Sequence, residues 1–171
     1  MQLILSVLSD DKPGVVREIA NVATSHDARW LDSQLGRLCG KFAGVIAIEV
    51  SEERSEALVQ ALGRLQERGI RVQAEPLIHA PADVLTQLAF EASAADRNGL
   101  VLELSQAIAD RGMNVLQLHT ECTSMPYSGD PLFSAEGIVE LPVGMAVEGA
   151  CEALEQVAAE LGMDFSIERV E

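Results

Sequence analysis

The chain carries the same succession of apolar and polar positions twice. Leu3, Leu5 and Val7 alternate with other residues, and Leu88, Phe90 and Ala92 repeat this alternation 85 residues later. Both are period-two patterns, which predict half-buried strands. After a turn, each segment continues with apolar residues on one face of a helix. These are Val15, Ile19, Val22 and Ala23 in the first repeat and Leu100, Leu104, Ala107 and Ile108 in the second.

The rest of each repeat follows the same order. A second and a third strand are predicted after each helix. Between these two strands of the second repeat lies a turn-rich insertion at 125–131, which raises the offset of the third strands to 91, so that Ile46 matches Gly137. An acidic amphipathic helix and a last strand close each repeat, with Gly69 or Gly162 between them. The predicted ranges are 29–38 and 114–123 for the second strands, 52–68 and 146–161 for the acidic helices, and 70–77 and 163–170 for the last strands.

The order β-α-β-β-α-β therefore occurs twice, in domains at 1–80 and 84–171. Two right-handed crossovers in such a chain give an antiparallel four-stranded sheet with both helices on one face. We predict an α+β protein of two tandem ferredoxin-like domains. The linker at 78–83 is too short for a flexible tether, so we expect the domains to pack together, and we expect the insertion to protrude as a loop.

Composition agrees with a globular protein whose cores are aliphatic, because 48% of its 171 residues are hydrophobic and only 4% are aromatic. No apolar run reaches the roughly 20 residues needed to cross a bilayer. The first ten residues are typical of a strand rather than a signal peptide. Three cysteines form no disulfide or CxxC pattern, as expected of thiols in a reducing compartment. We expect a cytoplasmic protein.

Charge restricts the class of partner. The chain has 27 acidic and 12 basic residues, which gives a formal net charge of −15. Nucleic-acid binding depends on clustered Lys and Arg that displace counterions from phosphates, and the sequence has no such cluster. If the protein regulates a gene, we expect it to do so by binding another protein rather than DNA.

The chain resembles the ACT-domain superfamily in its first strand, in the turn Asp11-Lys12-Pro13-Gly14, and in the helix and strand that follow. The chain also resembles the glycine cleavage system transcriptional repressor family. This narrower resemblance rests on two such domains with no enzyme attached, on Asp32-Ser33 in the second strand and on the loop at 125–131. The resemblance implies an amino-acid-responsive repressor that acts on a basic DNA-binding activator protein. It also implies a small amino acid, glycine, bound where two ACT domains meet.

The turn before the first helix of each repeat is the candidate site. A helix N-terminus presents unpaired N–H groups to a carboxylate, and glycine lets a ligand approach the backbone. Relatives that bind amino acids commonly use an Asn at the start of the second strand, where repeat two has Asn114 and repeat one has Arg29. This difference favours a site that contains Asn114. The candidate ligand-binding residues are Asp11, Pro13, Gly14, Asp96, Asn98, Gly99 and Asn114.

Structural roles compete with these assignments. Asp11 and Asp96 taken alone are better explained as helix caps. Gly14 and Gly99 are expected within the first turn of their helices, where glycine is unfavourable, and they serve packing as readily as ligand approach. His119 and Cys122 lie three apart on a strand, so they point to opposite faces and do not form half of a metal site. The sequence predicts no catalytic residue, metal or cofactor.

The prediction is therefore a non-enzymatic protein. The alternatives are a small metabolic enzyme acting in a cleft between the repeats and a stand-alone ACT regulator of an amino-acid pathway enzyme. The repeats could also pair across a homodimer instead of within one chain.

Overall fold

The computed structural model describes residues 1–78, 85–125 and 128–170. The chain divides into two compact units, the first from Met1 to Pro81 and the second from Ala82 to Glu171. Most of the linker lies outside the described residues, as do residues 126 and 127 of the insertion.

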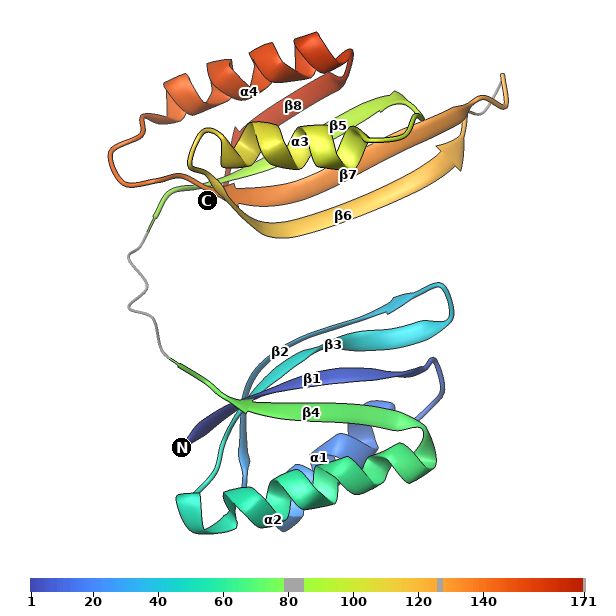
Figure 1. Cartoon of the computed structure of the whole chain (residues 1–171), viewed down its shortest axis with the longest axis vertical. Helices are drawn as coiled ribbons and strands as arrows, with labels where there is room; N and C mark the ends of the chain where they lie inside the picture. The colour runs from blue at the N-terminus through green and yellow to red at the C-terminus, as the bar shows by residue number, and fades with distance from the viewer. Residues whose placement is uncertain (79–84, 126–127, 171) are drawn as a thin grey trace. The chain divides into compact units, whose positions relative to one another are not determined.

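The first unit contains one antiparallel sheet with its helices on one side (Figure 1). The strands lie in the order β2-β3-β1-β4, so β1 is central and pairs with both β3 and β4. The elements are β1 (Gln2–Asp10), α1 (Val15–Ser25), β2 (Arg29–Leu38), β3 (Lys41–Glu49), α2 (Glu52–Gly63), a 3₁₀ helix (Arg64–Arg68) and β4 (Ile70–Pro76).

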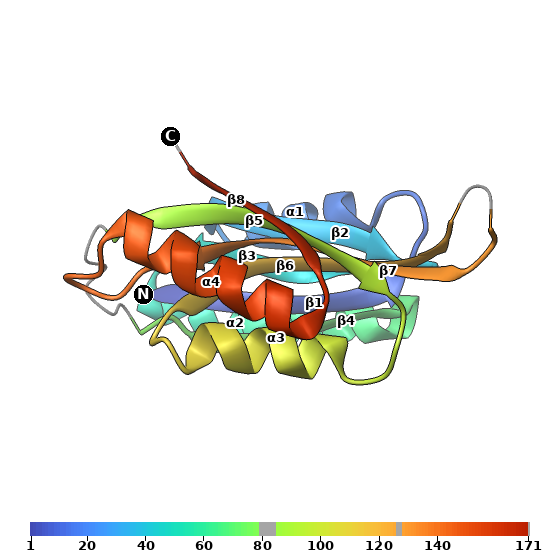
Figure 2. The ribbon, with the colours of Figure 1, turned by 90° about the horizontal axis from the view of Figure 1, so that it is seen from above.

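The second unit repeats this arrangement with the strand order β6-β7-β5-β8. The view in Figure 2 shows α3 and α4 side by side over one face of the sheet. The elements are β5 (Gln87–Ala95), α3 (Leu100–Ala109), β6 (Asn114–Ser124), β7 (Pro131–Glu140), α4 (Val147–Leu161) and β8 (Asp164–Arg169). The predicted α+β class, with tandem ferredoxin-like domains, is confirmed.

Strand pairing confirms both offsets of the internal repeat. Leu5 pairs with Ile46 in the first unit, and Phe90 pairs with Gly137 in the second. The residues of β1 and β5 differ by 85 in number, and those of β3 and β7 differ by 91. The edge strands also match, because β2 and β6 both carry an irregularity one residue after Trp30 or Val115.

Two local details differ from the sequence prediction beyond shifts of one residue at the ends of elements. The acidic helix of the first repeat ends at Gly63, and its last five predicted residues form the tighter 3₁₀ helix. Pro131, expected in the protruding loop, is the first residue of β7, a position where the missing N–H costs little.

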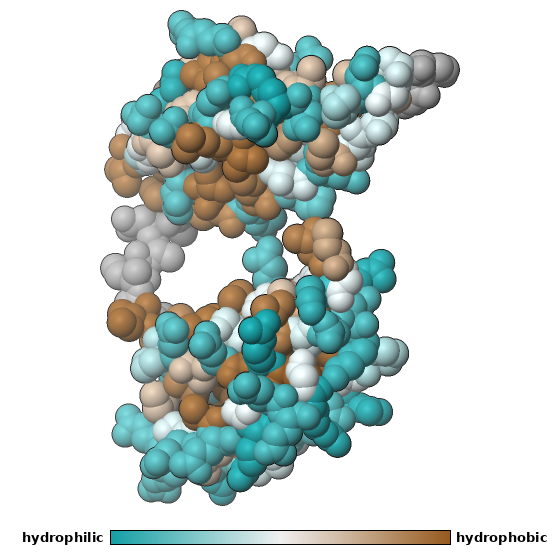
Figure 3. Space-filling view, turned by 45° about the vertical axis from the view of Figure 1, so that its right-hand side comes forward, coloured by the Kyte–Doolittle hydropathy of each residue, from teal (hydrophilic) through white to brown (hydrophobic). Residues whose placement is uncertain are grey.

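Each core lies between the helices and one face of the sheet. Alternate strand residues meet the apolar faces of the helices there, while hydrophilic residues dominate the outer side of the first unit's helices (Figure 3). The fully buried side chains include Leu5, Ile19, Ile46, Ile48 and Leu58 in the first unit and Leu88, Val139 and Ala150 in the second. None of the described helices is both long and apolar enough to span a membrane.

The centres of the two cores are filled by different pairs of residues. In the first unit the paired residues are Leu5 and Ile46, whereas in the second they are the larger Phe90 and the smallest residue, Gly137. A Cβ added at Gly137 would lie 2.8 Å from the Phe90 ring and 2.4 Å from the Gln117 carbonyl oxygen. Gly137 is therefore required by close packing.

Replacing Gly137 by Ala should destabilise the second unit by about 1–3 kcal/mol, because the ring and the neighbouring strand must both move. Gly149→Ala in α4 is a matched control, since its Cβ would meet no atom within 4 Å. The control should stabilise the helix by about 0.5–1 kcal/mol. Urea unfolding followed by circular dichroism measures both changes.

Fluorescence of Trp30, the chain's one tryptophan, reports on the first unit, where that residue packs against the core. If Gly137→Ala leaves the circular dichroism transition unchanged, the proposed packing requirement is wrong.

Candidate functional site

The turn before the first helix has the same backbone conformation in both units. Gly14 precedes α1 and Gly99 precedes α3, and each has a φ of 96°. The first helical hydrogen bonds follow directly, from the N–H of Glu18 to the Gly14 oxygen and from that of Glu103 to the Gly99 oxygen, both at 2.9 Å. A positive φ is unfavourable for residues with a Cβ, which explains why both positions are glycine.

This geometry corrects two sequence interpretations. Gly14 and Gly99 are the N-cap residues and lie before the first turn of the helix instead of inside it. Asp11 and Asp96 do not cap the helices, since neither N-terminus receives a side-chain cap hydrogen bond in the described structure. The amide groups of each first turn are therefore uncapped by side chains, and they carry the partial positive charge of a helix N-terminus.

In the second unit, an ion pair lies beside the turn. The Arg97 guanidinium donates two hydrogen bonds to the Glu103 carboxylate, at 2.7 and 2.6 Å. Hydrogen bonding with Arg97 holds the pKa of Glu103 below its usual value and raises the pKa of Arg97. A Cβ at Gly99 would lie 3.4 Å from the nearer Glu103 oxygen, so this carboxylate occupies space next to the turn.

The turn of the first unit is held by different side chains. The Asp11 carboxylate accepts a hydrogen bond from Arg37 at 3.3 Å. The backbone contact is shared, because the Asp11 N–H donates to the Gly40 oxygen and the Asp96 N–H to the Pro131 oxygen, both at 2.9 Å. The Lys12 ammonium donates to the Arg68 carbonyl oxygen at 2.5 Å. Pro13 lies between these anchors and Gly14. Asp11 thus fixes the turn to the β2–β3 hairpin.

Glu18 occupies the place in α1 that Glu103 occupies in α3, and it pairs with Arg68. Both helices therefore have a glutamate in their first turn that is ion-paired to an arginine. Sequence reasoning missed Arg97 and Glu103. The available signal was the recurrence of this glutamate at the 85-residue offset, four positions after the glycine.

Asn114 lies far from the turn of its own unit. It is the first residue of β6 and pairs with Glu140, at the end of the sheet where β5 begins, whereas Asn98 and Gly99 follow the end of β5. The ten residues of α3 separate the two ends, and at about 1.5 Å per residue they span roughly 15 Å. Within one unit, the structure does not bring Asn114 together with Asn98 and Gly99.

The side chain that the structure does bring to Asp96 is the Cys122 thiol, near the other end of β6. Hydrogen bonding to the Asp96 carboxylate raises the pKa of this thiol. Strand register places Cys122 opposite Phe133 on the helix side of the sheet and His119 opposite Glu136 on the other side. The predicted separation of His119 and Cys122 is therefore confirmed. The described residues contain no group of three or more His, Cys, Asp or Glu side chains suited to a metal ion.

The comparisons with known proteins agree on the fold. Residues 1–75 match the model of the ACT domain family. A crystal structure of an unknown protein from Galdieria sulphuraria has a TM-score of 0.79 and 23% identity, and it covers 99% of this chain and 98% of its own. A candidate glycine cleavage system transcriptional repressor has a TM-score of 0.78 and 16% identity, with coverages of 99% and 97%. No curated protein matches the sequence.

The ion pair beside Gly99 predicts a pH dependence. The pKa of Glu103 is lowered in the folded chain, so the pair contributes stability above the usual value of 4.5 and loses it as pH falls through the lowered value. Arg97→Gln should raise the pKa of Glu103 toward 4.5, and the stabilities of the two proteins should converge at acid pH.

Carbon-13 NMR titration of the Glu103 carboxyl measures this shift. Arg111→Gln is the control, because Arg111 follows α3 and donates to the Ala107 carbonyl oxygen near the other end of that helix. An unchanged Glu103 pKa in Arg97→Gln would show that the pair does not form in solution.

Proposed function

We propose that this chain, built of two ACT-type domains in tandem, is an amino-acid-responsive regulatory protein that represses transcription by binding an activator protein. The proposal rests first on the ACT family match of the first unit and on the fold shared with a candidate repressor of the glycine cleavage system. Its role is binding rather than catalysis. Glycine is the proposed ligand, and a basic DNA-binding activator is the proposed partner.

The single observation that carries the ligand proposal is the repeated glycine turn with uncapped amide groups. A zwitterionic amino acid needs donors for its carboxylate and acceptors for its ammonium group. The amides after Gly99 supply donors, and the Asn114 side-chain oxygen or the Asp96 carboxylate supplies an acceptor. Because Asn114 and Gly99 lie at opposite ends of the same unit, a ligand that touches both takes Asn114 from the second unit of one chain and Gly99 from the second unit of another, as in a homodimer.

The glutamate beside the turn affects this site directly. Glu103 already places a negative charge near the helix N-terminus, and a ligand carboxylate would be repelled by it. Arg97 offsets that repulsion by neutralising Glu103 through two short hydrogen bonds. If the ligand carboxylate replaces Glu103, the same guanidinium can receive it in the same bidentate geometry.

Action through a protein partner follows from electrostatics. A chain with a formal charge of −15 repels phosphates at every distance where charges are not screened. The same charge attracts a basic surface on a DNA-binding protein and raises the rate of association. The proposed complex is therefore repressor with activator, and the activator holds the DNA.

Asn114→Ala should weaken glycine binding about tenfold, because one or two hydrogen bonds of about 1 kcal/mol each are lost. Arg29→Ala, at the equivalent position of the first unit, is the control and should change affinity less than about twofold. Isothermal titration calorimetry measures both, and melting curves check that the fold is kept. Equal affinities for wild type and Asn114→Ala would exclude Asn114 from the site.

The purified protein alone should show no sequence-specific DNA binding at physiological salt, and its complex with the activator should weaken as salt rises. Surface charges are screened over about 8 Å at 0.15 M salt, which reduces attraction to a basic partner. Gel-shift assays with the promoter DNA, with and without activator, measure this. A specific shift by the protein alone would contradict the proposed mode of action.

A further inference from the structure

The two units carry very different charges. The first has 11 acidic and 9 basic residues, and the second has 16 acidic and 3 basic residues. Their formal charges are therefore −2 and −13, so almost the whole net charge belongs to the second unit. The fold that the two units share does not require this difference in charge. The excess of acidic residues in the second unit therefore points to a role other than folding.

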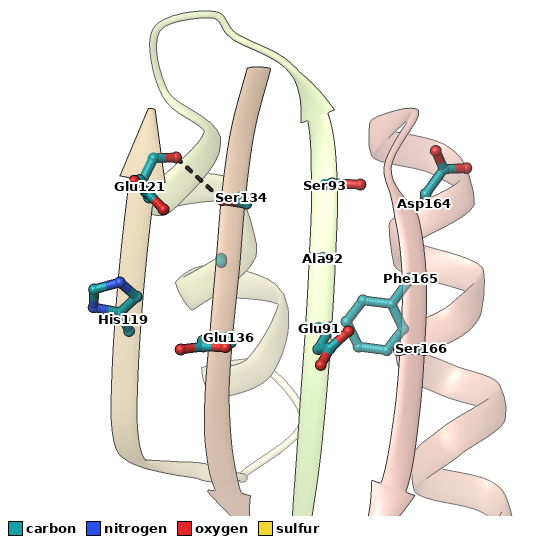
Figure 4. A pocket seen from close by; sticks show the side chains of 11 residues that line it. Glu91, Ala92, Ser93, His119, Glu121, Ser134, Glu136, Asp164, Phe165 and Ser166 are labelled. Atoms are coloured by element: carbon teal, nitrogen blue, oxygen red, sulfur yellow. Dashed lines mark hydrogen bonds between the residues drawn. The ribbon is translucent and has the colours of Figure 1, made fainter. Parts of the chain in front are cut away.

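The face of the second unit's sheet opposite α3 and α4 collects many of these charges. We call it the open face: it consists of the strand residues that alternate with the core residues and point away from α3 and α4. Its centre is hollowed, with a volume of about 500 Å³ (Figure 4). The polar lining side chains are those of Glu91, Ser93, His119, Glu121, Ser134, Glu136, Asp164 and Ser166.

Folding alone does not explain the carboxylates at the centre. Glu91 and Glu136 lie directly opposite each other on neighbouring strands, an arrangement in which like charges destabilise a sheet. In the first unit, the residues equivalent to Glu91, Glu136 and Asp164 by strand register are Ser6, Val45 and Arg71. The same architecture is therefore built without this repulsion.

In the described part of the second unit, none of the three arginines balances the open face. Arg97 pairs with Glu103, and Arg111, which follows α3, donates to the Ala107 carbonyl oxygen. Arg169 is the strand neighbour of the core residue Leu88, which places it on the helix side of the sheet. Across the described residues, no ion pair or hydrogen bond involves the carboxylates of Glu91, Glu121, Glu136 or Asp164. The face is thus complementary to a ligand that brings several positive charges.

We infer that the open face of the second unit is the docking surface for a lysine- and arginine-rich segment of a partner protein. This inference rests on the proposed function and assigns the partner to one surface. The segment's cations lie over Glu91, Glu136 and their acidic neighbours, while its aliphatic stems pack against Ala89 and Ile138 of the same face. Binding relieves the repulsion between the paired glutamates, and this relief favours the complex over the two separate proteins.

A labelled octalysine peptide, titrated into the full-length protein at low ionic strength, tests the inference. Glu91→Gln/Glu136→Gln should weaken its binding about fivefold, from two lost charge contacts of about 0.5 kcal/mol each. Glu152→Gln/Glu155→Gln removes the same charge from exposed positions on α4, which covers the other face, and should change affinity less than about twofold. Chemical-shift changes in wild type should fall on β5 to β8.

Equal weakening by the two double variants would overturn the inference, because binding would then follow net charge alone. Spermidine binding as tight as that of octalysine would also overturn it, since the hollow would then be a small-polyamine site. The melting temperature of Glu91→Gln/Glu136→Gln should rise, which separates lost binding from lost structure. Glycine calorimetry on wild type tests the proposed ligand response separately, because neither glutamate belongs to the glycine turn.

Discussion

Each unit has only two main helices for a four-stranded sheet, and this limits what the fold can bury by itself. Both helices pack on one face, where aliphatic strand residues form the core. The other face must stay compatible with water or be covered by something else. Side chains of a strand alternate between the two faces of the sheet. Once the core residues of a strand are fixed, the residues between them therefore lie on the face opposite the helices. The candidate turns lie at the edge of the same arrangement, where a central strand passes into the first helix.

Much of this fold could be predicted from the sequence because the two repeats of the chain can be aligned with each other. The matched alternation at Leu3 to Val7 and Leu88 to Ala92 gave the strands, and the change of offset at the insertion gave the register of β7. Each of these features is local in sequence, so a pattern of neighbouring residues was enough to find it.

The remaining features depend on contacts between distant residues. The role of Gly14 and Gly99 could not be read from their position near a helix, because only the backbone angle separates an N-cap from a residue of the first turn. The separation of Asn114 from Gly99 follows from the direction of α3 along the sheet. The opposition of Glu91 and Glu136 needs the strand register, since 45 residues separate them in sequence.

We propose that the second unit carries two tasks on one architecture. Its turn at Gly99 would offer amides that no side chain caps to a small anion, while its open face would offer carboxylates to a cationic protein. The central claim is that the chain responds to an amino acid, and backbone NMR of the nitrogen-15-labelled protein titrated with glycine tests it most directly. The account predicts saturable shifts at the amides that follow Gly99 and at Asn114. Shifts that do not saturate, or that avoid both places, would contradict it.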